Sequence, residues 1–81
     1  MFSCEQHDYL EIACMFKYLV DIQLKDTQHV YGRAITTRVR AGREYLVVDN
    51  QGESLEVEMT HMHSLKVLTQ GARFTELVIS A

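Results

Sequence analysis

The chain has 81 residues, of which 47% are hydrophobic and 23% are charged, and it contains no proline. This size and composition allow one modest core without a metal or disulfide framework, and they exclude a disordered protein. The formal net charge of −3 disfavours nucleic-acid binding, because affinity for phosphate backbones comes mainly from lysine and arginine. We therefore expect a single domain over residues 1–81.

The N-terminal segment begins with a predicted helix. Ser3 and Gln6 have the spacing of a capping box, which favours a helix start, and we expect the helix to end near Lys17. Acids recur one turn apart on one side of this helix, at Glu5, Asp8 and Glu11. An apolar face is predicted on another side, from Tyr9, Ile12, Ala13 and Phe16.

The same segment argues against secretion and against a disulfide. It lacks the basic start and apolar run of a signal peptide, and no stretch approaches the ~20 apolar residues of a membrane helix. We expect a cytoplasmic protein with no membrane association. In a helix, Cys4 and Cys14 lie roughly 15 Å apart along the axis, too far for a disulfide. Cys14 is expected to be a small core residue.

Strands follow the helix. Residues 20–25 alternate apolar and polar side chains, which predicts a half-buried strand, and Asp26-Thr27-Gln28 can turn the chain. Residues 29–40 predict a long strand bent at a glycine or bulge near Gly32. Ala41-Gly42 predicts a tight hairpin into a strand over residues 43–49.

Residues 50–52 predict the next turn. The fourth strand is expected to be amphipathic, with Leu55, Val57 and Met59 on one face. Residues 64–68 can continue the sheet, and residues 74–79 predict the last strand. The expected fold is α+β, mainly β: an N-terminal helix packed on a five- to six-stranded, bent antiparallel sheet.

Catalysis is not expected. A hydrolytic pair needs two carboxylates that converge on one cleft, and the acids here fall on outward positions of the helix and strands. The serines lack the glycine-flanked turn that exposes a nucleophile. Cys4 and His7 can touch across a helical turn, but a first turn rarely supplies a dry pocket and an oxyanion site. We therefore predict no enzyme activity and no catalytic residue.

A metal site remains an alternative. His61 and His63 project from the same side if this stretch is extended, and two imidazoles can bind zinc or copper. Two ligands make a weak site, and four assemble only if His7, His29 or Cys4 folds nearby. The competing interpretation is a polar pair on an edge strand with Met62 packed inward. We expect no metal and no cofactor.

Direct RNA or DNA binding is a further alternative, carried by arginines around the predicted hairpin: Arg33, Arg38, Arg40 and Arg43. The neighbouring strands carry acids, so cross-strand pairing is expected to neutralise much of this field. These acids are Glu44, Glu56 and Glu58.

Three separated blocks carry a resemblance to a known family. They are "CEQHDYLEIAC", "QLKD" and "EYLVVDNQGES". They resemble the small bacterial Rof (YaeO) family of inhibitors of Rho-dependent transcription termination, whose pattern is C-x-x-x-D-x-L-E-[LI]-A-C, then L-K-D and E-Y-L-V-V. The match needs no insertion between Cys4 and about Leu65. Gln6 and His7 stand where the family has another acid and an aromatic residue.

The resemblance implies an Sm-like open barrel and an inhibitor that acts without catalysis. It implies binding to the N-terminal primary RNA-binding region of the Rho hexamer, which keeps nascent RNA away and causes antitermination. The free protein is expected to be a monomer without direct nucleic-acid contacts. Asp8 and Glu11 are the main contact candidates that the resemblance implies, with further partner-binding residues at Glu5, His7 and Arg40.

Overall fold

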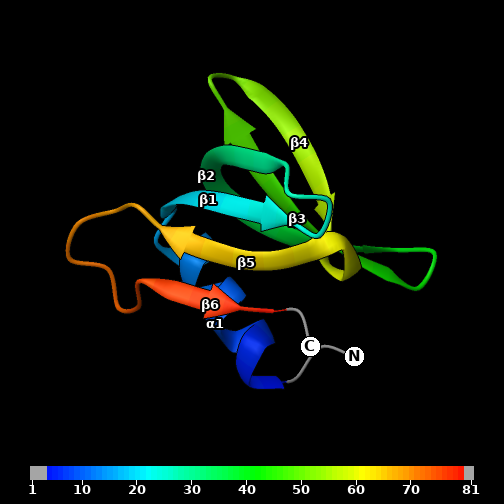
Figure 1. Cartoon of the computed structure of the whole chain (residues 1–81), viewed down its shortest axis with the longest axis horizontal. Coiled ribbons are helices and arrows are strands. Elements are labelled where there is room, and N and C mark those ends of the chain that lie inside the picture. Colours follow the sequence, from blue (N-terminus) through cyan, green and yellow to red (C-terminus); the bar gives the residue numbers. More distant parts are fainter. Residues whose placement is uncertain (1–3, 80–81) are drawn as a thin grey trace.

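The structure, a computed structural model, describes residues 4–79, with side chains from His7 onward. One helix precedes six strands, and a short 3-10 turn separates the fourth strand from the fifth (Figure 1). In chain order the elements are α1 (Cys4–Met15), β1 (Leu19–Leu24), β2 (His29–Arg40), β3 (Arg43–Asn50), β4 (Glu53–Glu58), η1 (Met59–His61), β5 (Met62–Val67) and β6 (Glu76–Val78). The predicted Ser3–Gln6 capping box lies outside the described residues and side chains.

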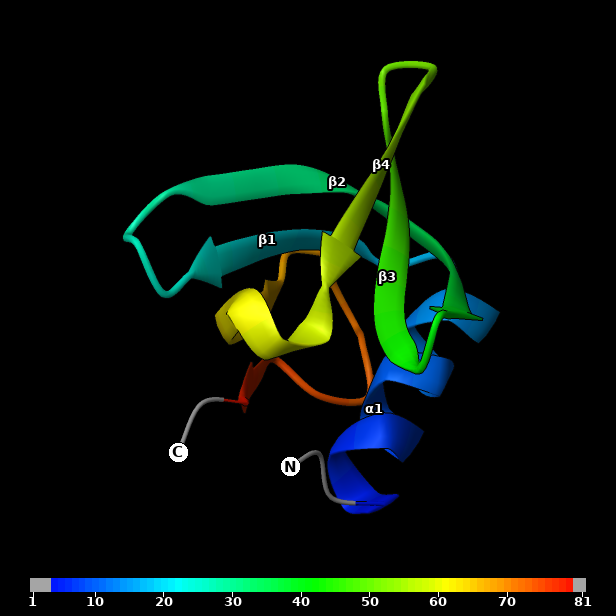
Figure 2. The ribbon, with the colours of Figure 1, turned by 90° about the vertical axis from the view of Figure 1, so that its right-hand side faces the viewer.

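The strands form one antiparallel sheet in the order β4-β3-β2-β1-β5-β6. The sheet is strongly bent, so β3 and β4 rise at an angle to β1 (Figure 2). The predicted fold class is confirmed: one helix and a six-stranded, open antiparallel sheet. The last strand is shorter than the predicted 74–79, and the fifth begins two residues earlier than predicted.

The irregularity that the sequence predicted near Gly32 in β2 is a bulge three residues farther along the strand. The register with β3 shifts between Ala34 and Thr36, so Ile35 is the extra residue of a bulge. Gly32 has another role, because a Cβ there would lie 2.8 Å from the carbonyl oxygen of Asp49. The glycine allows close approach of the β3 backbone, which alternation in the sequence alone cannot distinguish from a bend.

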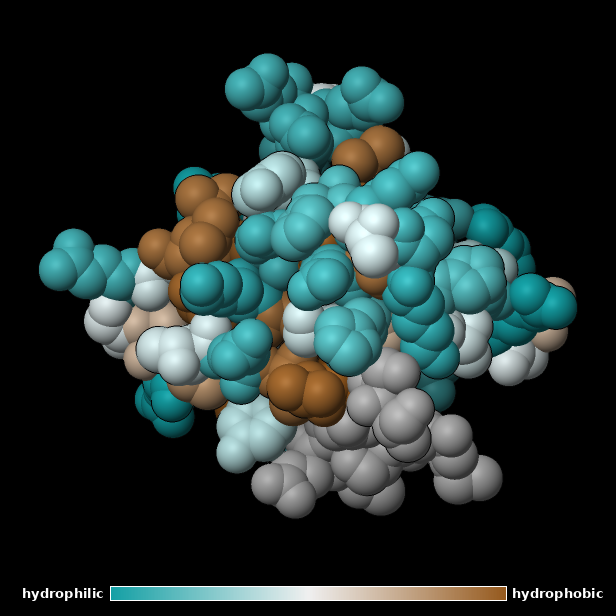
Figure 3. Space-filling view, in the orientation of Figure 1, coloured by the Kyte–Doolittle hydropathy of each residue, from teal (hydrophilic) through white to brown (hydrophobic). Residues whose placement is uncertain are grey.

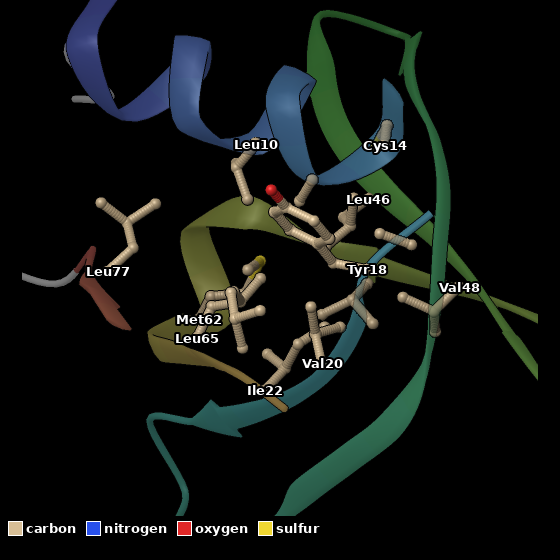
Figure 4. Packing of buried hydrophobic residues seen from close by; sticks show 14 of the residues in the cluster. Leu10, Cys14, Tyr18, Val20, Ile22, Leu46, Val48, Met62, Leu65 and Leu77 are labelled. Carbon is tan, nitrogen blue, oxygen red and sulfur yellow. The ribbon is translucent and has the colours of Figure 1, made fainter. Parts of the chain in front are cut away.

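The helix contacts the sheet through a face that the sequence predicted only in part. Leu10, Ala13 and Cys14 are buried in the core, and Figure 4 shows Leu10 pointing from α1 towards the side chains of the sheet. Tyr9 and Ile12 pack at the edge of this core as predicted. Phe16 was predicted to belong to the apolar face, but it is 46% exposed, because α1 ends at Met15 and the chain turns away.

A Schellman motif ends α1. Lys17 has a φ of 54°, and the N–H of Tyr18 donates to the carbonyl of Ala13 at 2.9 Å. The N–H of Lys17 donates to the carbonyl of Cys14 at 3.2 Å. This turn directs the buried Tyr18 ring into the core and leads the chain into β1. Helix and sheet are therefore joined rigidly within three residues.

Three further predictions concern single core residues. Cys14 is buried as predicted, and desolvation raises the pKa of its thiol to about 11, so the thiol is inert at neutral pH. Met62 packs inward as predicted. Met59 is buried but lies in η1 and not in the fourth strand, because the chain turns through η1 into β5.

Candidate partner-binding surface

The helix presents one side to solvent, opposite the buried Leu10, Ala13 and Cys14. Asp8, Glu11, Ile12 and Met15 occupy positions i, i+3, i+4 and i+7 on that side, and we refer to these four residues as the outer face of α1. Asp8, Glu11 and Met15 are exposed, whereas Ile12 is half-buried against the core. Of the predicted acid stripe, the side chain of Glu5 lies outside the described part.

His7 joins the helix to the sheet. Its Nδ1 lies 3.3 Å from Oε1 of Glu11, and its Nε2 lies 3.0 Å from Oε2 of Glu44 near the start of β3. Each ring nitrogen of His7 is therefore within bonding distance of a carboxylate oxygen, one on the helix and one on the sheet. The structure thus brings the predicted residues His7 and Glu11 together and adds Glu44, which the sequence assigned to the arginines.

The side chain of Asp8 differs from that of Glu11 in having no hydrogen bond or ion pair within residues 4–79. It is exposed and lies in the first half of α1, one turn before Glu11. A free carboxylate on a rigid helix can form a charge-assisted bond with an arginine or lysine of a partner without first breaking a bond of its own. Among the predicted contact residues whose side chains the structure describes, Asp8 is therefore the one whose charge is most available.

The hairpin arginines are in the opposite situation. Arg38 and Arg40 both contact the carboxylate of Glu56, each with a nitrogen–oxygen distance of 2.7 Å. The hydrogen bond from Arg40 lowers the pKa of Glu56, and the same bond raises the pKa of Arg40. The Arg40 guanidinium also lies 4.9 Å above the Tyr45 ring. The predicted contact residue Arg40 is thus already engaged within its own sheet.

Glu58 is the second acid that neutralises a hairpin arginine. Glu58 accepts a bond from Arg43 at 2.8 Å and one from the Thr60 hydroxyl at 2.9 Å, and both lower its pKa. The predicted cross-strand pairing of arginines with Glu56 and Glu58 is confirmed. Arg33 instead donates to the backbone carbonyl of Lys17 at 2.9 Å.

The predicted histidine pair does not lie on one extended strand. His61 belongs to η1 and its Nε2 contacts Oε2 of Glu58 at 2.9 Å, whereas His63 lies on β5. Within the described residues, no group of three or more His, Cys, Asp or Glu side chains could hold a metal ion. The condition for a shared site, an extended stretch over 61–63, is therefore not met.

Comparisons with known proteins identify the family. The family model described as "Modulator of Rho-dependent transcription termination (ROF)" matches residues 1–79. The chain belongs to the ROF family. Two similar relatives, each called "Protein rof", come from Escherichia coli (strain K12) and Shigella flexneri. Each is 32% identical over 62 residues, which are 76% of this chain and 74% of the relative.

A solved structure described as "YaeO bound to Magnesium from Vibrio cholerae O395" resembles the ROF chain described above. The TM-score is 0.81 at 25% sequence identity, and the match covers 89% of this chain and 95% of that one. The family resemblance read from the sequence is therefore confirmed, together with the fold class. Within residues 4–79, no helix is long and apolar enough to cross a membrane.

Membership of the ROF family assigns a regulatory role, the modulation of Rho-dependent transcription termination, and implies Rho as a partner.

Two residues of the candidate surface were missed by sequence reasoning. Glu44 was assigned to the hairpin arginines, although it pairs with His7. Met15 shares the 3–4 spacing of Asp8 and Glu11, and this spacing was the signal that could have placed it on the outer face of α1.

Proposed function

We propose that this ROF protein binds Rho at its N-terminal primary RNA-binding region through the outer face of α1 and so blocks access of RNA. Asp8 and Glu11 are the main contacts, and Glu5 and His7 lie on the same helix. Arg40 adds a secondary contact from the β2–β3 hairpin. The result is antitermination, meaning more transcription past Rho-dependent terminators.

The observation that carries the proposal is the exposed, unpaired carboxylate of Asp8 beside that of Glu11. A site that holds RNA must present cations to phosphates. Carboxylates spaced one helical turn, about 5 Å, apart can occupy such cations because they carry the same charge as phosphates. Opposite charges also speed association, so binding should weaken as the salt concentration rises.

The proposal includes how the protein acts. We infer a single, Sm-like domain over residues 1–81 that works in the cytoplasm as a monomer, without catalysis or a cofactor. It makes no direct contact with nucleic acid, because Arg38, Arg40 and Arg43 already have carboxylate partners. The alternative, an RNA-binding module acting through that hairpin, would have to break these ion pairs first.

The test is charge reversal with a matched control. Asp8→Arg should abolish binding to purified Rho, whereas Glu53→Arg, which changes the net charge by the same amount, should bind like the wild type. Glu53 is exposed and begins β4 at the β3–β4 turn, which lies at the opposite end of the molecule from α1 (Figures 1 and 2). Fluorescence anisotropy can measure the affinity, and circular dichroism can verify that both variants are folded.

Displacement of labelled RNA separates the two functions. If the protein is an inhibitor of Rho, it should displace labelled RNA from Rho. In the absence of Rho, it should leave the anisotropy of the labelled RNA unchanged. Unaltered affinity of Asp8→Arg for Rho would reject the outer face of α1 as the contact. Retention of RNA by the isolated protein would favour the RNA-binding module instead.

A further inference from the structure

Met15 is an exposed apolar side chain that does not belong to the buried core. It is 71% exposed, more than any other large hydrophobic side chain in the described residues. It ends α1 and lies on the outer face of α1, one turn beyond Glu11 and two turns beyond Asp8. Apolar side chains stabilise a fold by leaving water, so an exposed methionine contributes little to folding.

We propose that Met15 is the apolar anchor of the contact with Rho, an inference that rests on the proposed function. A region that binds single-stranded RNA offers cations for the phosphates and apolar or aromatic surfaces on which bases stack. Asp8 and Glu11 match the first kind of group, and Met15 matches the second. Its flexible thioether can fit irregular apolar hollows and contacts aromatic rings favourably.

The spacing on the helix supports this assignment. Glu11 and Met15 are four residues apart, which is about 6 Å along the axis. This separation is similar to that between a phosphate and the neighbouring base along an extended strand, so one rigid face can occupy both kinds of subsite. The partner surface is therefore expected to be an apolar hollow bordered by arginine or lysine.

The neighbouring apolar side chains are engaged elsewhere. Ile12 is half-buried against the core. Phe16 stacks on Tyr18 with ring centroids 5.7 Å apart, and the Arg73 guanidinium lies 5.1 Å from the Phe16 ring centre. On the outer face of α1, Met15 is thus the apolar side chain that a partner can bury.

The apolar and charged contacts should affect different rate constants. Attraction between exposed charges acts mainly on association and depends on salt, whereas a buried apolar anchor acts mainly on dissociation. Removal of Met15 should therefore speed dissociation and leave the salt dependence of binding unchanged. Removal of Asp8 should change association and the salt dependence together.

The experiment compares Met15→Ser, Met15→Leu and the control Tyr31→Ser in the full chain, with purified Rho immobilised for kinetic measurement. Tyr31 is 53% exposed and lies near the start of β2, which is remote from α1 in both ribbon views. We expect Met15→Ser to bind about tenfold more weakly, through faster dissociation, as burial of one methionine allows. Met15→Leu and Tyr31→Ser should bind like the wild type.

Two outcomes overturn the anchor. One is wild-type dissociation of Met15→Ser, and the other is an equal loss in Met15→Leu or Tyr31→Ser. Asp8→Arg, measured alongside, keeps the two proposals apart. If Asp8→Arg loses binding while Met15→Ser does not, only the anchor fails; if Asp8→Arg binds normally, the proposed function fails.

Discussion

The helix α1 and the strands β2 to β4 differ in whether their charged side chains are paired with opposite charges. On the strands, Arg38, Arg40 and Arg43 are held by Glu56 and Glu58. On the helix, Asp8 has no ion pair within residues 4–79, and Glu11 shares one histidine with Glu44. Hydrophilic side chains cover much of the face shown in Figure 3. The two regions differ in whether the charged side chains are paired.

This difference indicates where a partner can act. A charge that is already hydrogen-bonded to its neighbour must lose that bond before it can make another, so a paired surface binds a new partner with little net gain. An unpaired carboxylate on a rigid helix has no such cost. The paired hairpin arginines therefore stabilise mainly the sheet and can add only a secondary contact, whereas the outer face of α1 is the better candidate for the main regulatory contact.

The largest expected effect concerns the attachment of the helix. Leu10 is fully buried between α1 and the sheet. Leu10→Ala should lower the free energy of unfolding by about 2–4 kcal/mol, because it removes buried methyl groups and leaves a cavity. Leu55→Ala on β4, where the side chain is only partly buried, should cost less than half as much. Denaturant unfolding measures both, and equal losses would contradict a helix firmly packed on the sheet.

The acid response of the hairpin is the next largest. The hydrogen bond from Arg40 holds the pKa of Glu56 below the ordinary value of 4.5. Protonation therefore favours the unfolded chain: the stabilisation is complete above pH 4.5 and is lost as the pH falls through the lowered pKa. The wild type should lose more thermal stability between pH 5 and pH 3 than Glu56→Gln.

Melting curves of Arg40→Gln provide the control, because this variant removes the first cause of the lowered pKa. Its pH response should lie between those of the wild type and Glu56→Gln. A Glu56→Gln variant that lost as much stability in acid as the wild type would show that the ion pairs do not hold the hairpin.

Much of this fold was predictable from local signals. The period of two and the glycine turns located β1, β2 and β3 within one residue at each end. The exact position of the bulge, at Ile35, and the close approach at Gly32 were not predictable, because both depend on which strand lies opposite. The exposure of Phe16 depends on where the helix ends, and boundaries are the weakest part of a periodicity argument.

The candidate site was predictable in its charge but not in its pairing. Helical spacing placed Asp8 and Glu11 on one side, and strand order explained why Glu56 and Glu58 neutralise the arginines. The bond of His7 to Glu44 joins residues 37 positions apart in the sequence, from a helix to a strand. Only the packed structure brings such residues together, so the pairing that leaves Asp8 free could not be read from the chain.

The smallest expected effect concerns the turn of the β2–β3 hairpin. The charged side chains of this hairpin are already paired, but its backbone is unfavourable at the turn, where Ala41 has a φ of +52° and Gly42 a φ of +76°. Left-handed backbone is unfavourable for alanine and better tolerated by asparagine, the preferred residue at this turn position. Ala41→Asn should raise the free energy of unfolding by about 0.5–1 kcal/mol. Ala41→Val should lower it, because a β-branched side chain is strained at positive φ. A higher melting temperature for Ala41→Val than for Ala41→Asn would contradict this.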